Sequence, residues 1–263
     1  MTLDGDRVAL KLLVDRRREL TSARTQAACR LHRLLRELIA GGGPRELSTI
    51  KVKDLLSEVT PDGPAEQMRV ELAREHIADI ERIELRLDEI TAQITVMVKD
   101  NGTTLCRIFG IGFLSAAVVL AEVGEVARFP SRDHLASYAG TAPIDVSSGE
   151  EQRHRLNRAG NRQLNSAIHV AAIVQIRHDT PGRAYYRRKL DAGKTKREAL
   201  RCLKRRITDA VWHQLQIDAE LEPEPQDESW PRWRSTRGNS PKYSSPATLR
   251  ANGRPMQPKS IGV

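Results

Sequence analysis

The stretch "EQMRVELAREHIADIERIELRLDEITAQITVMVK" (residues 66–99) decides the fold class. Its apolar residues alternate steps of three and four, the heptad spacing of a long helix that buries one face. This seam consists of Ile80, Ile83, Leu87, Ile90, Ile94 and Met97. The sequence therefore predicts a helix from about Glu66 to Lys99. Its buried face belongs either to the core of a helical bundle or to a dimerisation arm.

A second long amphipathic segment precedes this helix, at residues 6–40. Its apolar positions also recur at helical spacing, and they are Leu13, Leu20, Ala27, Leu31, Leu34 and Leu38. "GGGP" at 41–44 ends the helix, and a short helix is expected at Ser48–Val59. Two long helices joined by a short insert predict a coiled-coil helical hairpin. We assign residues 1–100 to this arm.

The next segment, residues 101–218, predicts a compact helical domain. Helices are expected at 114–123, 131–139, 161–177, 181–191 and 196–217. Thr195 and Glu198 have the spacing of a capping box that opens the last helix. Inside it, a buried stripe is predicted at Leu200, Leu203, Ile207, Val211 and Leu215. Residues 219–263 are rich in Pro, Ser and Arg and predict a disordered tail. The fold class is mainly α.

Charge is concentrated in one part of the chain. The 263 residues carry a formal charge of +9. Residues 153–206 contain sixteen Lys or Arg and three acids, so this segment alone carries +13. Of the 43 basic residues of the chain, 33 are Arg, whose planar fork pairs with phosphate. One basic surface on a nearly neutral body indicates a nucleic-acid partner.

Several classes of protein are excluded. No apolar run of about 18 residues exists, so no membrane span or membrane partner is expected. The three cysteines are far apart and have no zinc spacing with the histidines, which indicates reduced thiols in a cytoplasmic protein. The carboxylates do not cluster as a two-metal site requires. We therefore expect no metal or other cofactor in this chain.

The segment "LCRIFGIGFLSAAVVLAEVG" (105–124) fits a helix–hairpin–helix element. Gly110 and Gly112 would let the hairpin backbone approach a phosphate, and the following helix would direct free N–H groups toward the anion. Such an element grips the nucleic-acid backbone and reads no bases. The alternative is a glycine turn that packs two helices.

Basic residues elsewhere predict a groove with stacking aromatics. Three runs contribute to it: "RHRLNR" and the arginine that follows at 162, "YYRRK" at 185–189, and "KRR" at 204–206. The candidate nucleic-acid contacts are Arg153, Arg155, Arg158, Arg162, Tyr185, Arg187, Arg188, Lys189, Lys204 and Arg205.

Two serines stand just before the first of these runs, in Ser147-Ser148-Gly149. On chemistry alone, Ser-Ser-Gly after a proline is usually a turn. A serine hydroxyl is also a poor nucleophile unless a base or a metal activates it. The residues alone therefore give only a weak indication of catalysis.

From Leu105 to about Leu215 the chain closely resembles the C-terminal domain of the IS110 family of bacterial insertion-sequence transposases, to which Piv-type invertases are related. The matching stretches are "GIGFLSAAVVLAEVGEVARFPSRDHLASYAGTAP", the Pro143 to Gly149 segment, "RLNRAGNRQLN" and "RHDTPGRAYYRRKLDAGKTKREALRCLKRR". The helix "LLVDRRRELTSARTQAACRLHRLLREL" is similar to the start of the family's coiled coil.

The resemblance implies a DNA transposase, which cuts and rejoins strands. In this family a RuvC-like domain holds Mg²⁺ with four acidic residues, and a serine forms a transient phosphoserine link to DNA. By position that serine is Ser148, with Ser147 as the second choice. The resemblance also implies DNA as a partner, a structured non-coding RNA of the element in at least part of the family, dimers or tetramers formed through the coiled coil, and a nucleoid-associated place in the bacterial cytoplasm.

The chain departs from the family in one respect, since it begins almost at the coiled-coil helix. We therefore expect the acidic domain to be missing, through a misassigned start, a truncated gene or a separate chain that supplies it. The predicted function is the serine-bearing part of a transposase. The alternatives are a non-catalytic DNA- or RNA-binding protein derived from a transposase, and a coiled-coil scaffold whose basic domain meets acidic proteins.

Overall fold

A computed structural model describes residues 3–44, 48–148, 151–155 and 159–220, and for 3–4, 144–148 and 151–155 it describes the backbone alone. The predicted tail, residues 219–263, falls almost entirely outside this part of the chain. The mainly α fold is confirmed. The helices are α1 (Leu3–Leu38), α2 (Thr49–Glu58), α3 (Pro64–Asp100), α4 (Phe113–Val123), α5 (Arg132–Tyr138), α6 (Arg162–Arg177), α7 (Pro181–Asp191) and α8 (Lys196–Glu220), with two 3-10 turns, η1 (Leu105–Arg107) and η2 (Val126–Arg128).

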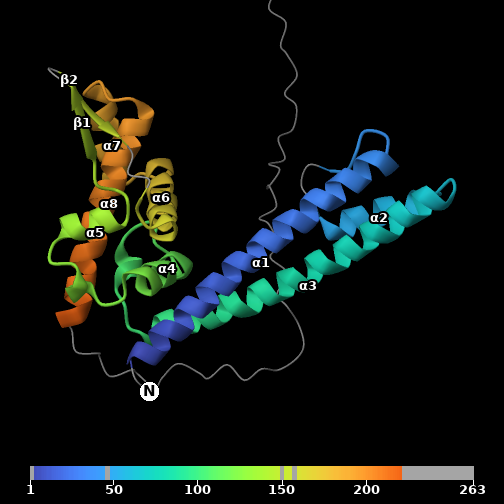
Figure 1. The fold of residues 1–263 in the computed structure, drawn as a ribbon, viewed down its shortest axis with the longest axis horizontal. Helices are drawn as coiled ribbons and strands as arrows, with labels where there is room; N and C mark the ends of the chain where they lie inside the picture. Colours follow the sequence, from blue (N-terminus) through green and yellow to red (C-terminus); the bar gives the residue numbers. More distant parts are fainter. Residues whose placement is uncertain (1–2, 45–47, 149–150, 156–158, 221–263) are drawn as a thin grey trace, which may run out of the picture. The chain divides into compact units, whose positions relative to one another are not determined.

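Helices α1 and α3 form a long helical hairpin that α2 covers near its turn (Figure 1). The α3 seam faces α1, as the heptad spacing predicts. Ile80, Ile90 and Ile94 are at most 2% exposed, and the other three seam residues are partly buried. Apolar side chains of α1, α2 and α3 form one hydrophobic cluster at the far end of the hairpin, around Leu31 and Ile77. The seam is therefore filled within one chain, while the coiled-coil geometry stays a prediction.

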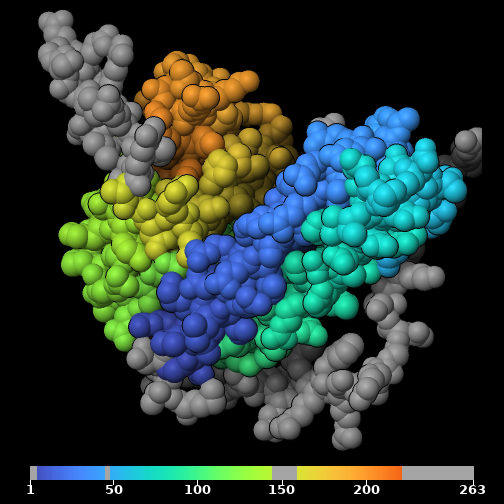
Figure 2. Space-filling model, turned by 45° about the vertical axis from the view of Figure 1, so that its right-hand side comes forward, coloured from blue at the N-terminus to red at the C-terminus, as the bar shows by residue number. Residues whose placement is uncertain are grey.

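The base of the hairpin packs against α4, and its core continues into that of α5, α6 and α8. Leu10 and Val14 from α1 and Ile90, Ile94 and Val98 from α3 share a hydrophobic core with these helices. The surfaces of α1 and α6 meet in the space-filling view (Figure 2). The division into an arm (1–100) and a domain (101–218) stays a prediction, because the core is continuous across residue 100.

Helix α8 shows why the helical predictions succeed. Its predicted stripe is buried from Leu203 to Leu215, and Leu200 is partly buried. The capping box is formed, since the Thr195 N–H donates to Glu198 Oε2 at 2.9 Å and the Glu198 N–H donates to Thr195 Oγ1 at 3.4 Å. No helix in the described part of the chain has the length and apolar character that a bilayer crossing requires.

Two predicted features differ from the structure. The stretch for which the sequence predicts only a turn at Ser147-Ser148-Gly149 contains an antiparallel hairpin, β1 (Ile144–Ser148) and β2 (Glu151–Arg155). The signal was present, because Ile144 and Val146 alternate with polar residues before Ser-Gly. The proposed helix–hairpin–helix begins with only the three-residue turn η1 before Gly110, so that element is not confirmed.

Candidate serine and nucleic-acid site

The hairpin places the candidate nucleophile at the end of a strand. Ser148 is the last residue of β1, and its Cα pairs with that of Glu151. Within β2, Arg153 pairs with Val146 and Arg155 pairs with Ile144. The backbone thus brings the serine and two of the predicted arginines onto adjacent strands. Arg158 lies outside the described residues, and Arg162 is the exposed first residue of α6.

Two glycines meet at the root of this hairpin. A Cβ placed on Gly160 would lie 2.3 Å from the Cα of Gly140, so no side chain fits there. Gly140 itself has φ of 66°, a conformation that favours glycine. Directly after this contact, the Asn161 N–H donates to the carbonyl of Tyr138 at 2.6 Å. The two ends of the hairpin segment are therefore held together by backbone contacts.

Asn161 connects the root to a buried carboxylate. Its Oδ1 caps α6 by accepting from the Leu164 N–H at 2.9 Å. Its Nδ2 donates to Glu122 Oε2 at 2.5 Å and to the Tyr138 hydroxyl at 3.1 Å. The other oxygen of Glu122 accepts from Lys11 Nζ of α1 at 2.8 Å. This hydrogen bond raises the pKa of Lys11 above its usual value. We call these four residues, Lys11, Glu122, Tyr138 and Asn161, the root network.

A second contact at the root uses a residue that the sequence assigned to nucleic acid. Lys204 is buried, and its ammonium donates to Asn165 Oδ1. Asn165 in turn donates to the carbonyl of Ala139 at 2.7 Å. Burial lowers the pKa of Lys204, and burial together with the charge of Lys204 lowers the pKa of His169. Lys204 as a phosphate contact stays a prediction, and in this structure its buried ammonium already has a partner in Asn165.

Helix α7 gathers several of the predicted contacts around one ring. Thr180 caps the helix by accepting from the Arg183 N–H at 3.1 Å. The Tyr185 ring is half-buried, and three cations lie over it. Arg206 Cζ is 5.0 Å, Lys189 Nζ 5.3 Å and Arg188 Cζ 5.8 Å from its centroid. We call Tyr185, Arg188, Lys189 and Arg206 the Tyr185 cluster.

Arg206 belongs to this cluster, although the sequence analysis named its neighbours Lys204 and Arg205 as the nucleic-acid contacts. In α8 the buried face includes Leu203, Lys204 and Ile207, so residue 206 falls on the outer face. Helical periodicity was the signal that could have shown which residue of "KRR" (204–206) faces the core and which faces outward. Arg205 instead forms ion pairs with Asp133 and Asp209. Arg187 is exposed on α7, and Figure 1 shows α7 and the β1–β2 hairpin at the same end of α8.

The two glycines of the 105–124 motif have different surroundings. A Cβ on Gly110 would lie 2.8 Å from the carbonyl oxygen of Ala171 in α6, and Gly110 has φ of 89°. Gly110 is thus a packing turn against α6. Gly112 precedes α4 in an extended conformation, and a Cβ there would meet open space. Of the two, only Gly112 leaves room for a ligand.

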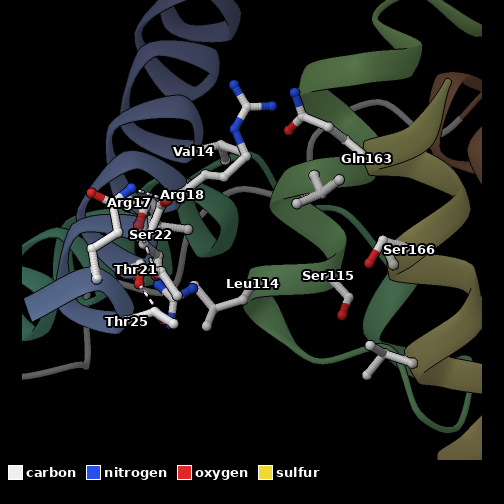
Figure 3. A pocket seen from close by; sticks show the side chains of 15 residues that line it. Val14, Arg17, Arg18, Thr21, Ser22, Thr25, Leu114, Ser115, Gln163 and Ser166 are labelled. Atoms are coloured by element: carbon white, nitrogen blue, oxygen red, sulfur yellow. Dashed lines mark hydrogen bonds between the residues drawn. The ribbon is translucent and has the colours of Figure 1, made fainter. Parts of the chain in front are cut away.

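A groove of about 610 Å³ lies between α1, α4 and α6 (Figure 3). Its polar side chains include Arg17, Arg18, Ser22, Ser115, Gln163 and Ser166. The two arginines already have partners, since Arg17 donates to Thr91 at 3.1 Å and Arg18 pairs with Asp15 at 3.1 Å. The groove is the junction between the arm and the other helices, and its contacts indicate no particular ligand.

The metal that the resemblance implies has no matching ligand set in the described ranges. No three His, Cys, Asp or Glu side chains lie close enough there to bind an ion together. The described carboxylate at the hairpin root, Glu122, is engaged otherwise, because it binds Lys11 and Asn161. We therefore derive no chemical step through a metal held by these residues.

Comparison with known proteins confirms the resemblance. Residues 102–187 match the model of the transposase IS116/IS110/IS902 family. A 43.6 kDa protein of insertion element IS110 from Streptomyces coelicolor is 36% identical over 129 residues, 48% of this chain and 32% of the relative. A 44.8 kDa protein of insertion element IS116 from Streptomyces clavuligerus is 30% identical over 163 residues, 61% and 40% of the two chains. The pilin gene-inverting protein of Moraxella bovis is 28% identical over 116 residues, which are 43% of this chain and 36% of the relative.

The matched family segment contains the hairpin, the root network except Lys11, α6 and most of α7. The chain covers only about a third of the length of these relatives.

Proposed function

We propose that this chain supplies the serine-bearing and DNA-binding part of a transposase. Its residues 102–187 match the model of the insertion-element transposases. The observation that supports this proposal is the match itself, since it spans the hairpin on which Ser148 ends β1. DNA is the proposed substrate, and the arginines of β2 and the Tyr185 cluster are its proposed phosphate contacts.

The proposed reaction is a transesterification. The Ser148 hydroxyl loses its proton to a base and attacks a DNA phosphorus, which forms a phosphoserine ester. The bond from phosphorus to one sugar oxygen breaks, and that oxygen leaves with a proton as a hydroxyl. Covalent catalysis of this kind conserves the ester for rejoining. Arg153 and Arg155, on the neighbouring strand, would balance the charge of the phosphate through charge-assisted hydrogen bonds.

Activity is proposed for an assembly that also contains a Mg²⁺-binding acidic domain of the RuvC type. A structured RNA and a dimer or tetramer belong to the same proposal. The α3 seam is already buried against α1. Association through the arm would therefore use its outer face, where Leu85 is 68% and Val96 55% exposed. Sedimentation of the chain alone measures its self-association, and sedimentation with RNA measures RNA binding.

The second candidate is a nucleic-acid-binding protein without chemistry. The Tyr185 cluster favours it, because cations around a ring bind a nucleic-acid strand whether or not a nucleophile is present. The two functions share DNA binding and differ only in the covalent step.

The test is a search for a covalent protein–DNA adduct. The full chain is mixed with the acidic domain of an intact relative, Mg²⁺, the RNA of the element and labelled element-end DNA. A denaturing gel then detects the adduct. We expect the unaltered chain and Ser147→Ala to form it and Ser148→Ala to lose it, because only one hydroxyl is the proposed nucleophile.

Each other result has a defined meaning. An adduct that persists in Ser148→Ala and disappears in Ser147→Ala moves the nucleophile to residue 147. DNA binding without any adduct in the unaltered chain supports the non-catalytic function.

A further inference from the structure

We infer that Lys11 and Glu122 are positioning residues that couple the arm to the root of the serine hairpin. The coupling rests on geometry alone, and its consequence for strand transfer rests on the proposed function. Lys11 belongs to α1 and Glu122 to α4, whereas Asn161 ends the hairpin segment. A single carboxylate thus binds both the arm and the hairpin root.

The carboxylate of Glu122 needs its partners. Its side chain is 6% exposed, and a buried charge is strongly disfavoured unless it is paired and hydrogen-bonded. Lys11 pairs with one oxygen and Asn161 donates to the other. The Lys11 side chain is 45% exposed, so its aliphatic part is not a core element. Lys11 therefore contributes through its charge on Glu122 more than through packing.

Asn161 transmits the state of Glu122 to the hairpin. Its amide can adopt only one orientation in which Nδ2 reaches Glu122 and Tyr138 while Oδ1 caps α6. Its backbone N–H holds Tyr138, two residues before Gly140. If Glu122 loses its cation, the buried carboxylate is left uncompensated, and the geometry of its contact with Asn161 changes. The first residues to loosen are then those that close the hairpin root.

A second contact joins α1 to α6, the helix that Asn161 caps. Gln163, two residues after Asn161, donates to Asp15 of α1 at 3.2 Å, and Asp15 lies 3.9 Å from Lys11. Both contacts come from adjacent turns of α1. The position of the arm and the geometry at the start of α6 are therefore linked at two points.

Amide hydrogen exchange of the full chain tests the coupling without any activity. The probes are the Asn161 N–H, bound to Tyr138, and the Leu164 N–H, bound to the Asn161 side chain. We expect Lys11→Met to accelerate exchange at both probes about tenfold or more, while Lys11→Arg keeps it near the original rate. Glu122→Gln, which keeps the shape of the side chain and removes its charge, is expected to act like Lys11→Met.

The matched control is Lys53→Met, which breaks the exposed Lys53–Glu81 pair of 2.6 Å between α2 and α3. It is expected to leave both probes unchanged. The coupling is overturned if Lys11→Met leaves the probes unchanged, or if Lys53→Met accelerates them equally through a general loss of stability.

The adduct assay then tests the consequence. We expect Lys11→Met to slow adduct formation about tenfold at unchanged DNA affinity, and Lys11→Arg to restore it. Equal adduct rates in Lys11→Met and the unaltered chain overturn the positioning role. If the probes respond to Lys11→Met and the unaltered chain forms no adduct, the coupling stands and the proposed transposase chemistry fails.

Discussion

At the scale of single residues, Gly110 and Gly112 show that one motif contains two physical roles. Gly110 is required by its positive φ and by the backbone of Ala171 at contact distance. Gly112 has φ of −93° and ψ of 177°, which any residue adopts. Gly112 is the N-cap of α4, a position that suits glycine, and the open space around it also leaves room for a ligand.

Alanine at each position separates the two roles. Gly110→Ala is expected to lower the free energy of unfolding by roughly 1–3 kcal/mol or more, because it adds backbone strain and a clash with α6. Gly112→Ala is expected to change it by less than about 1 kcal/mol, since only the cap of α4 alters. Urea denaturation followed by circular dichroism measures both.

The same pair tests phosphate contact at Gly112. We expect Gly112→Ala to weaken binding to a DNA duplex about tenfold, the effect of losing a contact worth about 1.4 kcal/mol. Fluorescence anisotropy measures the dissociation constant. Binding equal to that of the unaltered chain would leave the packing turn as the whole role of the motif.

At the scale of elements, α7 and α8 place three positive charges around the Tyr185 ring. Their mutual repulsion would be reduced by a negatively charged partner. Within the described residues, the three cations of the Tyr185 cluster form no ion pair, while Arg205 beside them has two acidic partners. Like charges around one ring repel each other in the free protein. A phosphate backbone would remove this repulsion and release counterions.

The salt dependence of binding measures how many of these cations contact phosphate. We expect Arg188→Gln and Arg206→Gln each to reduce the slope of log affinity against log salt by about 0.9 on duplex DNA. The matched control is Arg86→Gln on α3, whose partner Glu89 lies 2.6 Å away on the same exposed face. Anisotropy titrations between about 50 and 200 mM salt give the slopes. Slopes equal to those of the unaltered chain and of Arg86→Gln would remove the cluster from the interface.

The elements also show what sequence patterns could and could not predict. The long helices follow from periodicity, because each buries a continuous apolar face; the 181–191 prediction coincides with α7. The β1–β2 hairpin was not predicted, because the alternation in β1 covers only Ile144 and Val146 and all five residues of β2 are polar. The root network was not predicted from the sequence for another reason. It joins Lys11 to residues more than a hundred positions away, and such contacts leave no periodic signal.

At the scale of the whole molecule, the base of the arm and the helices after it share one core. Ile90 of α3 is fully buried in the cluster that also contains Leu203 and Val211 of α8. A boundary at residue 100 would divide this cluster between two separately folding parts. A shared core instead favours one cooperative unit, because exposing either half removes apolar contacts from the other.

Ile90→Ala decides between these two descriptions. The loss of a buried isoleucine side chain is expected to cost about 2–5 kcal/mol. If the core is one unit, native-state hydrogen exchange will show the same loss of protection in α8 as in α3, because both open in the same event. Leu85→Ala on α3, where the side chain is 68% exposed, is the matched control and is expected to change protection by less than about 0.5 kcal/mol. A loss confined to α1–α3 would instead establish the arm as an independent domain, and α8 would then keep its original protection. Joint unfolding would mean that a force or ligand acting on the arm is felt at the hairpin root through the core as well as through Lys11.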